Sequence, residues 1–126
     1  MSSPTAFVAN DWQANGSIDD PTGATPSVDD GNVVYADDEF GSVAAARCVL
    51  RVDATSASDP TNVTIVAKQA DRSLGFSVPA GDVVWIGPFD RDDFERRFIP
   101  VDSLPFTVDQ NTGVVVSAFV LPAIAT

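Results

Sequence analysis

The chain has 126 residues, 44% of them hydrophobic, and a formal net charge of −11. This length fits a single domain, and the hydrophobic fraction is normal for a globular protein. The charge argues against nucleic acids and anionic membranes as partners, because phosphate groups are bound through lysine and arginine and the chain has only seven basic residues against eighteen acidic ones.

Residues 1–32 are polar and acidic. Their apolar residues are confined to short islands at Ala6–Val8 and at Trp12, among many Pro, Gly, Ser, Thr, Asn and Asp residues. Such a segment buries too little apolar surface to offset its ordering entropy. We therefore predict an extended acidic N-terminal arm over residues 1–32. It is either loosely ordered or becomes ordered on a partner, with Phe7 and Trp12 as aromatic anchors. The arm lacks the pattern of a secretory signal, so export by that route is not expected.

From residue 33 onward the sequence is typical of short strands separated by turns. The segments 48–53 and 62–68 alternate apolar and polar residues with a period of two, the pattern of half-buried strands. Their expected inward-facing side chains are Cys48, Leu50, Val52, Val63, Ile65 and Ala67. Further strands are expected over residues 75–78, 83–86 and 113–121.

The segment "VPAGDVVWIGPF", residues 78–89, contains the strand expected over residues 83–86 and the turn that joins it to the strand over 75–78. Pro79–Gly81 is typical of a turn, and Gly87–Pro88 ends strand pairing because proline has no N–H for the ladder. Either Val83 and Trp85 or Val84 and Ile86 face the core. Phe89 and Phe94 are expected to cap that core, with Trp85 or Phe89 exposed at a subunit interface as the alternative.

These patterns predict an all-β fold, with a compact antiparallel β-sandwich or small barrel over residues 33–126 and the extended arm before it. Helix is expected at most as one turn in "DRDDFERRF", residues 90–98, where aspartates lie near the start and arginines near the end. No apolar run approaches the ~20 residues that span a bilayer.

Catalytic motifs are lacking in the sequence. Because the chain has no histidine, it cannot form a Ser-His-Asp triad or a histidine-containing zinc site. Cys48 is the single cysteine and lies in an inward strand position, which favours an inert core thiol. The paired aspartates occur in polar, turn-like segments, so no raised carboxyl pKa is expected. We predict a protein that is not an enzyme and needs no cofactor.

Carboxylates in loops are the usual ligands of calcium, and this chain has several aspartate clusters in turn-like segments. The segment that begins at Asp90 fails as an EF-hand loop, since Glu95 and Val101 occupy the positions that require Gly and Glu. A non-standard site remains an alternative to a solvated acidic surface. Its candidate ligands are Asp29, Asp30, Asp37, Asp38 and Glu39. An acidic, lysine-poor surface also suits a salt-rich environment, where charge repulsion is screened.

Residues 30–121 resemble small structural proteins encoded near the major capsid protein of many tailed bacterial and archaeal viruses. The resemblance lies in a turn, three strand-like segments and a Pro-Ala-Gly to Gly-Pro-Phe spacing. The matching segments are Asp30–Asn32, Leu50–Val52, Val63–Val66, Val78–Gly81, Ile86–Phe89 with Phe94, and residues 113–121. The acidic N-terminal segment and "FIPVDSLPFTVDQNT", residues 98–112, depart from the pattern.

The resemblance implies a capsid decoration (cement) protein or another minor head protein. Its partner would be the major capsid protein of the same virus. It would be made in the host cytoplasm, occupy the outer capsid surface and form homo-oligomers, trimers above all. Candidate partner-binding residues are Phe7, Trp12, Trp85, Phe89 and Phe94. The alternatives are a head-tail, neck or tail component and a glycan-binding adhesion module.

Overall fold

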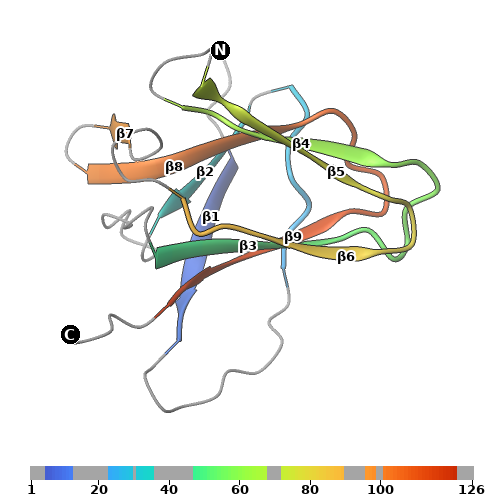
Figure 1. Cartoon of the computed structure of the whole chain (residues 1–126), viewed down its shortest axis with the longest axis horizontal. Helices are drawn as coiled ribbons and strands as arrows, with labels where there is room; N and C mark the ends of the chain where they lie inside the picture. The colour runs from blue at the N-terminus through green and yellow to red at the C-terminus, as the bar shows by residue number, and fades with distance from the viewer. Residues whose placement is uncertain are drawn as a thin grey trace.

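The computed structural model is all-β, and its described residues contain no α-helix (Figure 1). The structure describes residues 5–12, 23–29, 31–35, 47–67, 72–89, 96–98 and 101–121. Their strands are β1 (Thr5–Asp11), β2 (Asn32–Tyr35), β3 (Cys48–Asp53), β4 (Thr61–Ile65), β5 (Leu74–Val78), β6 (Val83–Ile86), β7 (Arg96–Phe98), β8 (Val101–Val108) and β9 (Val115–Val120). The predicted all-β class is confirmed.

Eight strands follow one another in a single, nearly closed barrel-like sheet. Their order is β5-β4-β8-β2-β1-β9-β3-β6, and β7 pairs with β8 beside this path. The two end strands, β5 and β6, are consecutive in the chain and are joined by the turn at Pro79–Asp82. Pairing is antiparallel except along β1, which is parallel to both β2 and β9.

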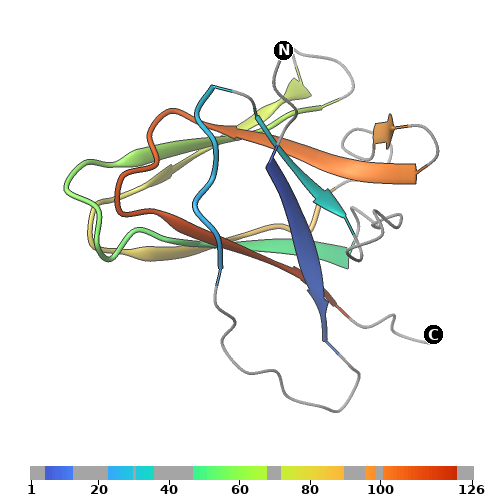
Figure 2. The ribbon, with the colours of Figure 1, turned by 180° about the vertical axis from the view of Figure 1, so that it is seen from behind.

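The sheet folds into two layers around one core. In Figure 1, β4, β5 and β8 form the upper layer, while β3, β6 and β9 form the lower one. Figure 2 shows β1, in blue, running obliquely from the upper layer to the lower one. Three of the largest fully buried side chains, Phe106, Leu50 and Ile65, belong to the core cluster between the layers.

The predicted boundary between an arm and a domain at residue 32 is not where the structure divides the chain. Residues Thr5–Asp11 are extended, but they form β1 in the middle of the sheet rather than an arm beside it. Residues 12–31 separate β1 from β2, and parallel neighbours need a connection of this length. The polar composition of residues 1–32 did not predict this strand, because Phe7 and Ala9 are buried by partners that are distant in sequence.

Between residues 90 and 112 one expectation is corrected, and one strand was not expected. The predicted helical turn is wrong at its end, since Arg96–Phe98 forms β7; residues 90–95 lie outside the described residues. Much of the segment that departs from the viral pattern is β8, a central strand. Pro105 lies where the β4–β8 ladder ends: its carbonyl accepts from the Val66 N–H at 3.1 Å, but it has no N–H to donate.

The two alternating segments are confirmed. Burial alternates along β3, with Cys48, Leu50 and Val52 inside, and Val63, Ile65 and Ala67 are likewise buried. The turn before β6 is also as expected, because the Asp82 N–H donates to the Pro79 carbonyl at 3.1 Å and Gly81 has a φ of 88°. Positive φ favours glycine at that position.

Candidate docking face

The register of β6 decides which way Trp85 points. Trp85 lies opposite Arg51 of β3, and Ile86 lies opposite Leu50, which is fully buried. Ile86 is therefore inside, whereas Trp85 points outward and is 51% exposed. Of the two phases that the sequence left open, the one that places Val84 and Ile86 toward the core is the correct one.

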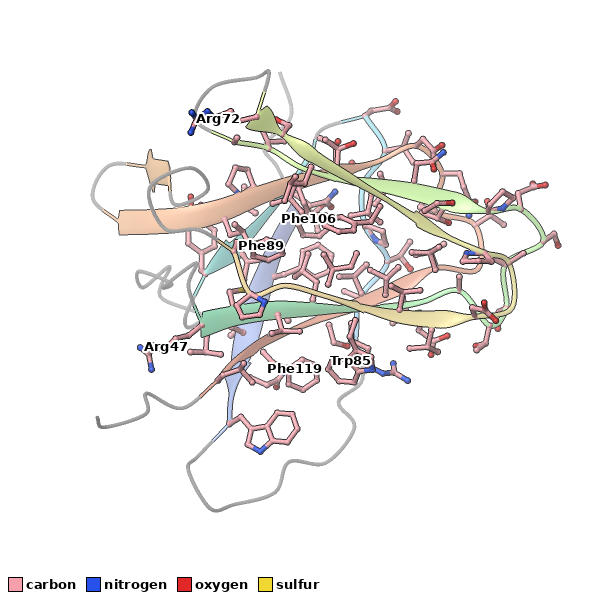
Figure 3. All side chains as sticks on the ribbon, viewed as in Figure 1. Arg47, Arg72, Trp85, Phe89, Phe106 and Phe119 are labelled. Atoms are coloured by element: carbon pink, nitrogen blue, oxygen red, sulfur yellow. The ribbon has the colours of Figure 1, made fainter. Side chains whose placement is uncertain are left out.

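Trp85 packs against a second aromatic cluster, on the outer side of the lower layer. Its ring centroid lies 5.2 Å from that of Phe119 on β9, and the ring of Trp12 lies 6.2 Å from Phe119 on the other side. Phe119 is only 1% exposed, yet it does not belong to the central core cluster. Figure 3 shows Trp85 and Phe119 together below the lower layer, away from Phe106 and Phe89. We call Trp12, Trp85, Phe119 and the adjacent Arg51 the aromatic face.

Arg51 is the charged residue of the aromatic face, and it contacts both Trp85 and Asp53. The Arg51 guanidinium carbon lies 5.9 Å from the centre of the Trp85 ring, and its Nη1 lies 3.4 Å from Oδ2 of Asp53. Asp53 also accepts hydrogen bonds from the N–H and hydroxyl of Thr55, which lower the pKa of the Asp53 carboxyl. Val115 on β9 and Val8 on β1 are further exposed apolar side chains. A neutral, aromatic patch thus lies on a strongly acidic molecule.

The five predicted partner-binding residues fall in different environments. Phe7 and Phe89 are core residues, 4% and 5% exposed, and the Phe7 ring packs 5.3 Å from that of Phe106. Burial of both rings argues against their assignment to an interface, and Phe89 packs in the core, as the alternative prediction had it. Trp12 and Trp85 come together around Phe119. Phe94 lies outside the described residues.

Sequence reasoning missed Phe119 and Arg51 as parts of this face. Along β9, Val116 and Ala118 point to the core, so Phe119 falls in the outward phase. A large aromatic in the outward phase of a strand whose inward phase is already apolar signals a second buried surface. The segment "GVVVSAFVL" has this pattern, and the register of β9 against β3 shows that Phe119 is the residue in the outward phase.

Asp53 and Asp109, whose carboxyl pKa is lowered, accept hydrogen bonds at turns and strand ends. Asp109 accepts hydrogen bonds from the backbone N–H and the side-chain amide of Asn62, at 2.8 and 2.7 Å, which lower its pKa. A general acid needs the opposite shift. Within the described ranges, no three His, Cys, Asp or Glu side chains are grouped as metal ligands. Of the candidate calcium ligands only Asp29 is described; Asp30, Asp37, Asp38 and Glu39 lie outside.

Cys48 is buried, and burial raises the pKa of its thiol from 9.0 to about 12. The thiol stays protonated in the folded chain while the unfolded chain ionises above its ordinary value, so the folded state loses stability as pH rises. We expect the free energy of unfolding to fall by up to about 1.4 kcal/mol per pH unit between pH 9 and 12.

Urea unfolding of the wild type and of Cys48→Ala across this pH range checks that expectation. The difference between the two proteins isolates the thiol from lysine and tyrosine titration. Equal slopes in both proteins would contradict it.

The chain matches no family model, and no curated protein or solved structure matches it. In the part of the chain that the structure describes, no helix is long and apolar enough to span a membrane.

Proposed function

We propose that this protein is a virion structural protein that decorates the outer surface of an icosahedral capsid and docks through its aromatic face. The observation that carries the proposal is the half-exposed Trp85, which packs on buried Phe119 and beside Arg51. Tryptophan and arginine are enriched among residues that dominate binding energy, above all where they are already held in place by their neighbours.

Charge and architecture support this proposal. A net charge of −11 is repelled by packaged nucleic acid and favours the outer side of a shell. A nearly closed sheet supplies a rigid platform, which lowers the entropic cost of docking. The resemblance to small capsid-associated proteins includes the β5–β6 turn and Ile86–Phe89, which flank Trp85. The partner is then the major capsid protein of the same virus, and trimers at local three-fold positions are the expected copy arrangement.

Trp85→Ala is expected to weaken capsid binding at least about thirtyfold, equivalent to about 2 kcal/mol, because a preorganised aromatic anchor is lost. The measurement is co-sedimentation with capsids that lack the protein, followed by imaging of the decorated particles. Leu74→Ala is the matched control, since Leu74 is 43% exposed on β5 in the other layer. Saturable binding at fixed lattice positions that only Trp85→Ala weakens supports the proposal. Absence of binding to every capsid state contradicts it.

The same observation favours a second candidate, a glycan-binding module. Sugars stack on exposed aromatic rings and hydrogen-bond to neighbouring charged and polar side chains, and Trp85 with Arg51 and Asp53 offers both. Titration with a panel of neutral oligosaccharides, followed by tryptophan fluorescence, separates the two candidates. Saturable quenching that Trp85→Ala abolishes, together with no capsid binding, favours the glycan.

A further inference from the structure

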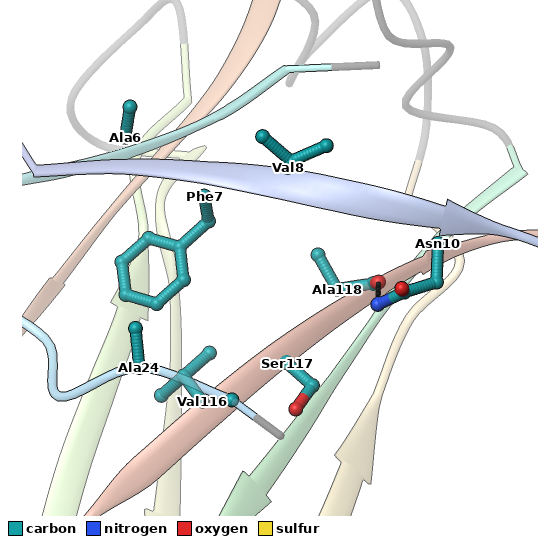
Figure 4. A pocket seen from close by; sticks show the side chains of 9 residues that line it. Ala6, Phe7, Val8, Asn10, Ala24, Val116, Ser117 and Ala118 are labelled. Carbon is teal, nitrogen blue, oxygen red and sulfur yellow. Dashed lines mark hydrogen bonds between the residues drawn. The ribbon is translucent and has the colours of Figure 1, made fainter. Parts of the chain in front are cut away.

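A pocket opens in the sheet where β1 and β9 diverge (Figure 4). β1 pairs with β9 only at Ala9–Asp11, whereas its first half pairs with β2. The gap is bordered by a short segment at Gly23–Ala24, which bridges to Val116 of β9 through two backbone hydrogen bonds of 2.9 and 3.0 Å. The cavity between them has a volume of about 220 Å³.

In the part of the chain that the structure describes, the edge of β1 that faces this pocket has no partner strand at Ala6. The Thr5 N–H donates to the carbonyl of Gly31 at 3.1 Å, toward β2. Since alternate residues of a strand direct their N–H and C=O groups to opposite edges, those of Ala6 point toward the pocket. Among the described residues, no strand pairs with Ala6 on that side. Ala6 therefore presents a donor and an acceptor in the geometry of an open sheet edge.

Ser117 supplies a second hydrogen-bonding group to the pocket wall. It is 4% exposed, and its Oγ is the one buried side-chain oxygen or nitrogen in the described residues without a hydrogen-bond partner. A Cβ on Gly23 would lie 2.6 Å from this oxygen and 2.5 Å from the carbonyl of Val116, so only glycine allows the segment to lie so close. An unpartnered buried hydroxyl costs stability unless something else binds it.

The remaining wall is uncharged. Apolar side chains of Phe7, Val8 and Val116 line it, together with the amide of Asn10, which donates to the Ala118 carbonyl at 2.9 Å. Among the described residues, no charged side chain lines the pocket, although the chain carries eighteen acidic residues. A charged ligand would lose its hydration without gaining an ion pair there, so the wall suits a neutral ligand.

We propose that this pocket binds a short extended peptide segment with small, uncharged side chains. The peptide backbone adds to the open edge of β1 at Ala6, and a polar group of the peptide pairs with Ser117. Strand addition provides backbone hydrogen bonds, and the pocket walls restrict the side chains. A volume of about 220 Å³, below the range of drug-sized sites, limits the side chains to small ones. This site adjoins the aromatic face, because Ser117 lies opposite Arg51, but its lining includes none of the four residues of that face. Peptide binding is therefore tested without capsids.

The test is NMR titration of the ¹⁵N-labelled full chain with the neutral peptide acetyl-Ala-Ser-Ala-amide, up to about 10 mM, since a ligand of this size binds weakly. Saturating shifts of the Ala6, Gly23 and Ser117 amides are expected. Glycerol is the second probe. No shifts with the peptide, or equal shifts of the same amides with glycerol, would overturn the proposal.

Ser117→Ala is expected to weaken peptide binding about fivefold, because one hydrogen bond is lost. The matched control is Ser77→Ala, which removes an exposed hydroxyl from β5 and should leave binding unchanged. The denaturation midpoint of Ser117→Ala should equal or exceed that of the wild type, since an unpartnered buried hydroxyl is removed. Unchanged peptide affinity in Ser117→Ala would overturn the role of the hydroxyl and the proposal with it.

Discussion

Deletion of residues 2–11 is expected to abolish folding rather than to trim a dispensable arm. These residues include all of β1, which lies between β2 and β9 and joins the two layers of the sheet. Without it, Val34 and Ala118 lose the strand between them, and the Phe7 ring no longer covers Phe106. We expect loss of cooperative thermal unfolding by circular dichroism and collapse of amide shift dispersion by NMR.

Deletion of residues 2–4 is the matched control, because it leaves Thr5–Asp11 in place. We expect both this variant and the full chain to unfold cooperatively. A cooperative, native-like transition after deletion of residues 2–11 would contradict the central position of β1. The comparison also bears on capsid binding, since a loss of binding after the longer deletion would report unfolding and not the removal of an anchor.

Phe106→Ala is expected to destabilise the protein by about 3–5 kcal/mol. Phe106 is fully buried on β8, and its ring lies 5.3 Å from that of Phe7, so truncation removes a contact between β8 and β1 and leaves a cavity. Urea unfolding measures the effect. A loss of this size is a large part of the stability of a domain of this length.

Val115→Ala is the control for Phe106→Ala. Val115 lies on β9 and is 37% exposed, so its truncation should change the free energy of unfolding by about 0.5 kcal/mol or less. A cost below about 1 kcal/mol for Phe106→Ala would mean that the two layers do not share the core described here.

The candidate docking face was only partly predictable. Trp12 and Trp85 were candidates because exposed tryptophan is typical of interfaces, but the sequence left the phase of Trp85 open. The pairing of Trp85 with Arg51 decides it. Phe7 and Phe89 are aromatic residues in short apolar segments, as Trp85 is, yet they are buried. Their burial follows from strands far away in the sequence, which no local pattern contains.

Local periodicity by itself determined the all-β class and the inward residues of β3 and β4, and Pro79–Gly81 determined the turn before β6. A period of two reports the two faces of a strand, whichever strand it pairs with. Only the tertiary structure decided that Thr5–Asp11 is a central strand and that Val101–Val108 pairs between β2 and β4 despite Pro105. It also decided that the outward Phe119 is covered by Trp85 and Trp12. These features depend on which distant segments lie side by side. The alternation within one segment does not say which distant strand it pairs with.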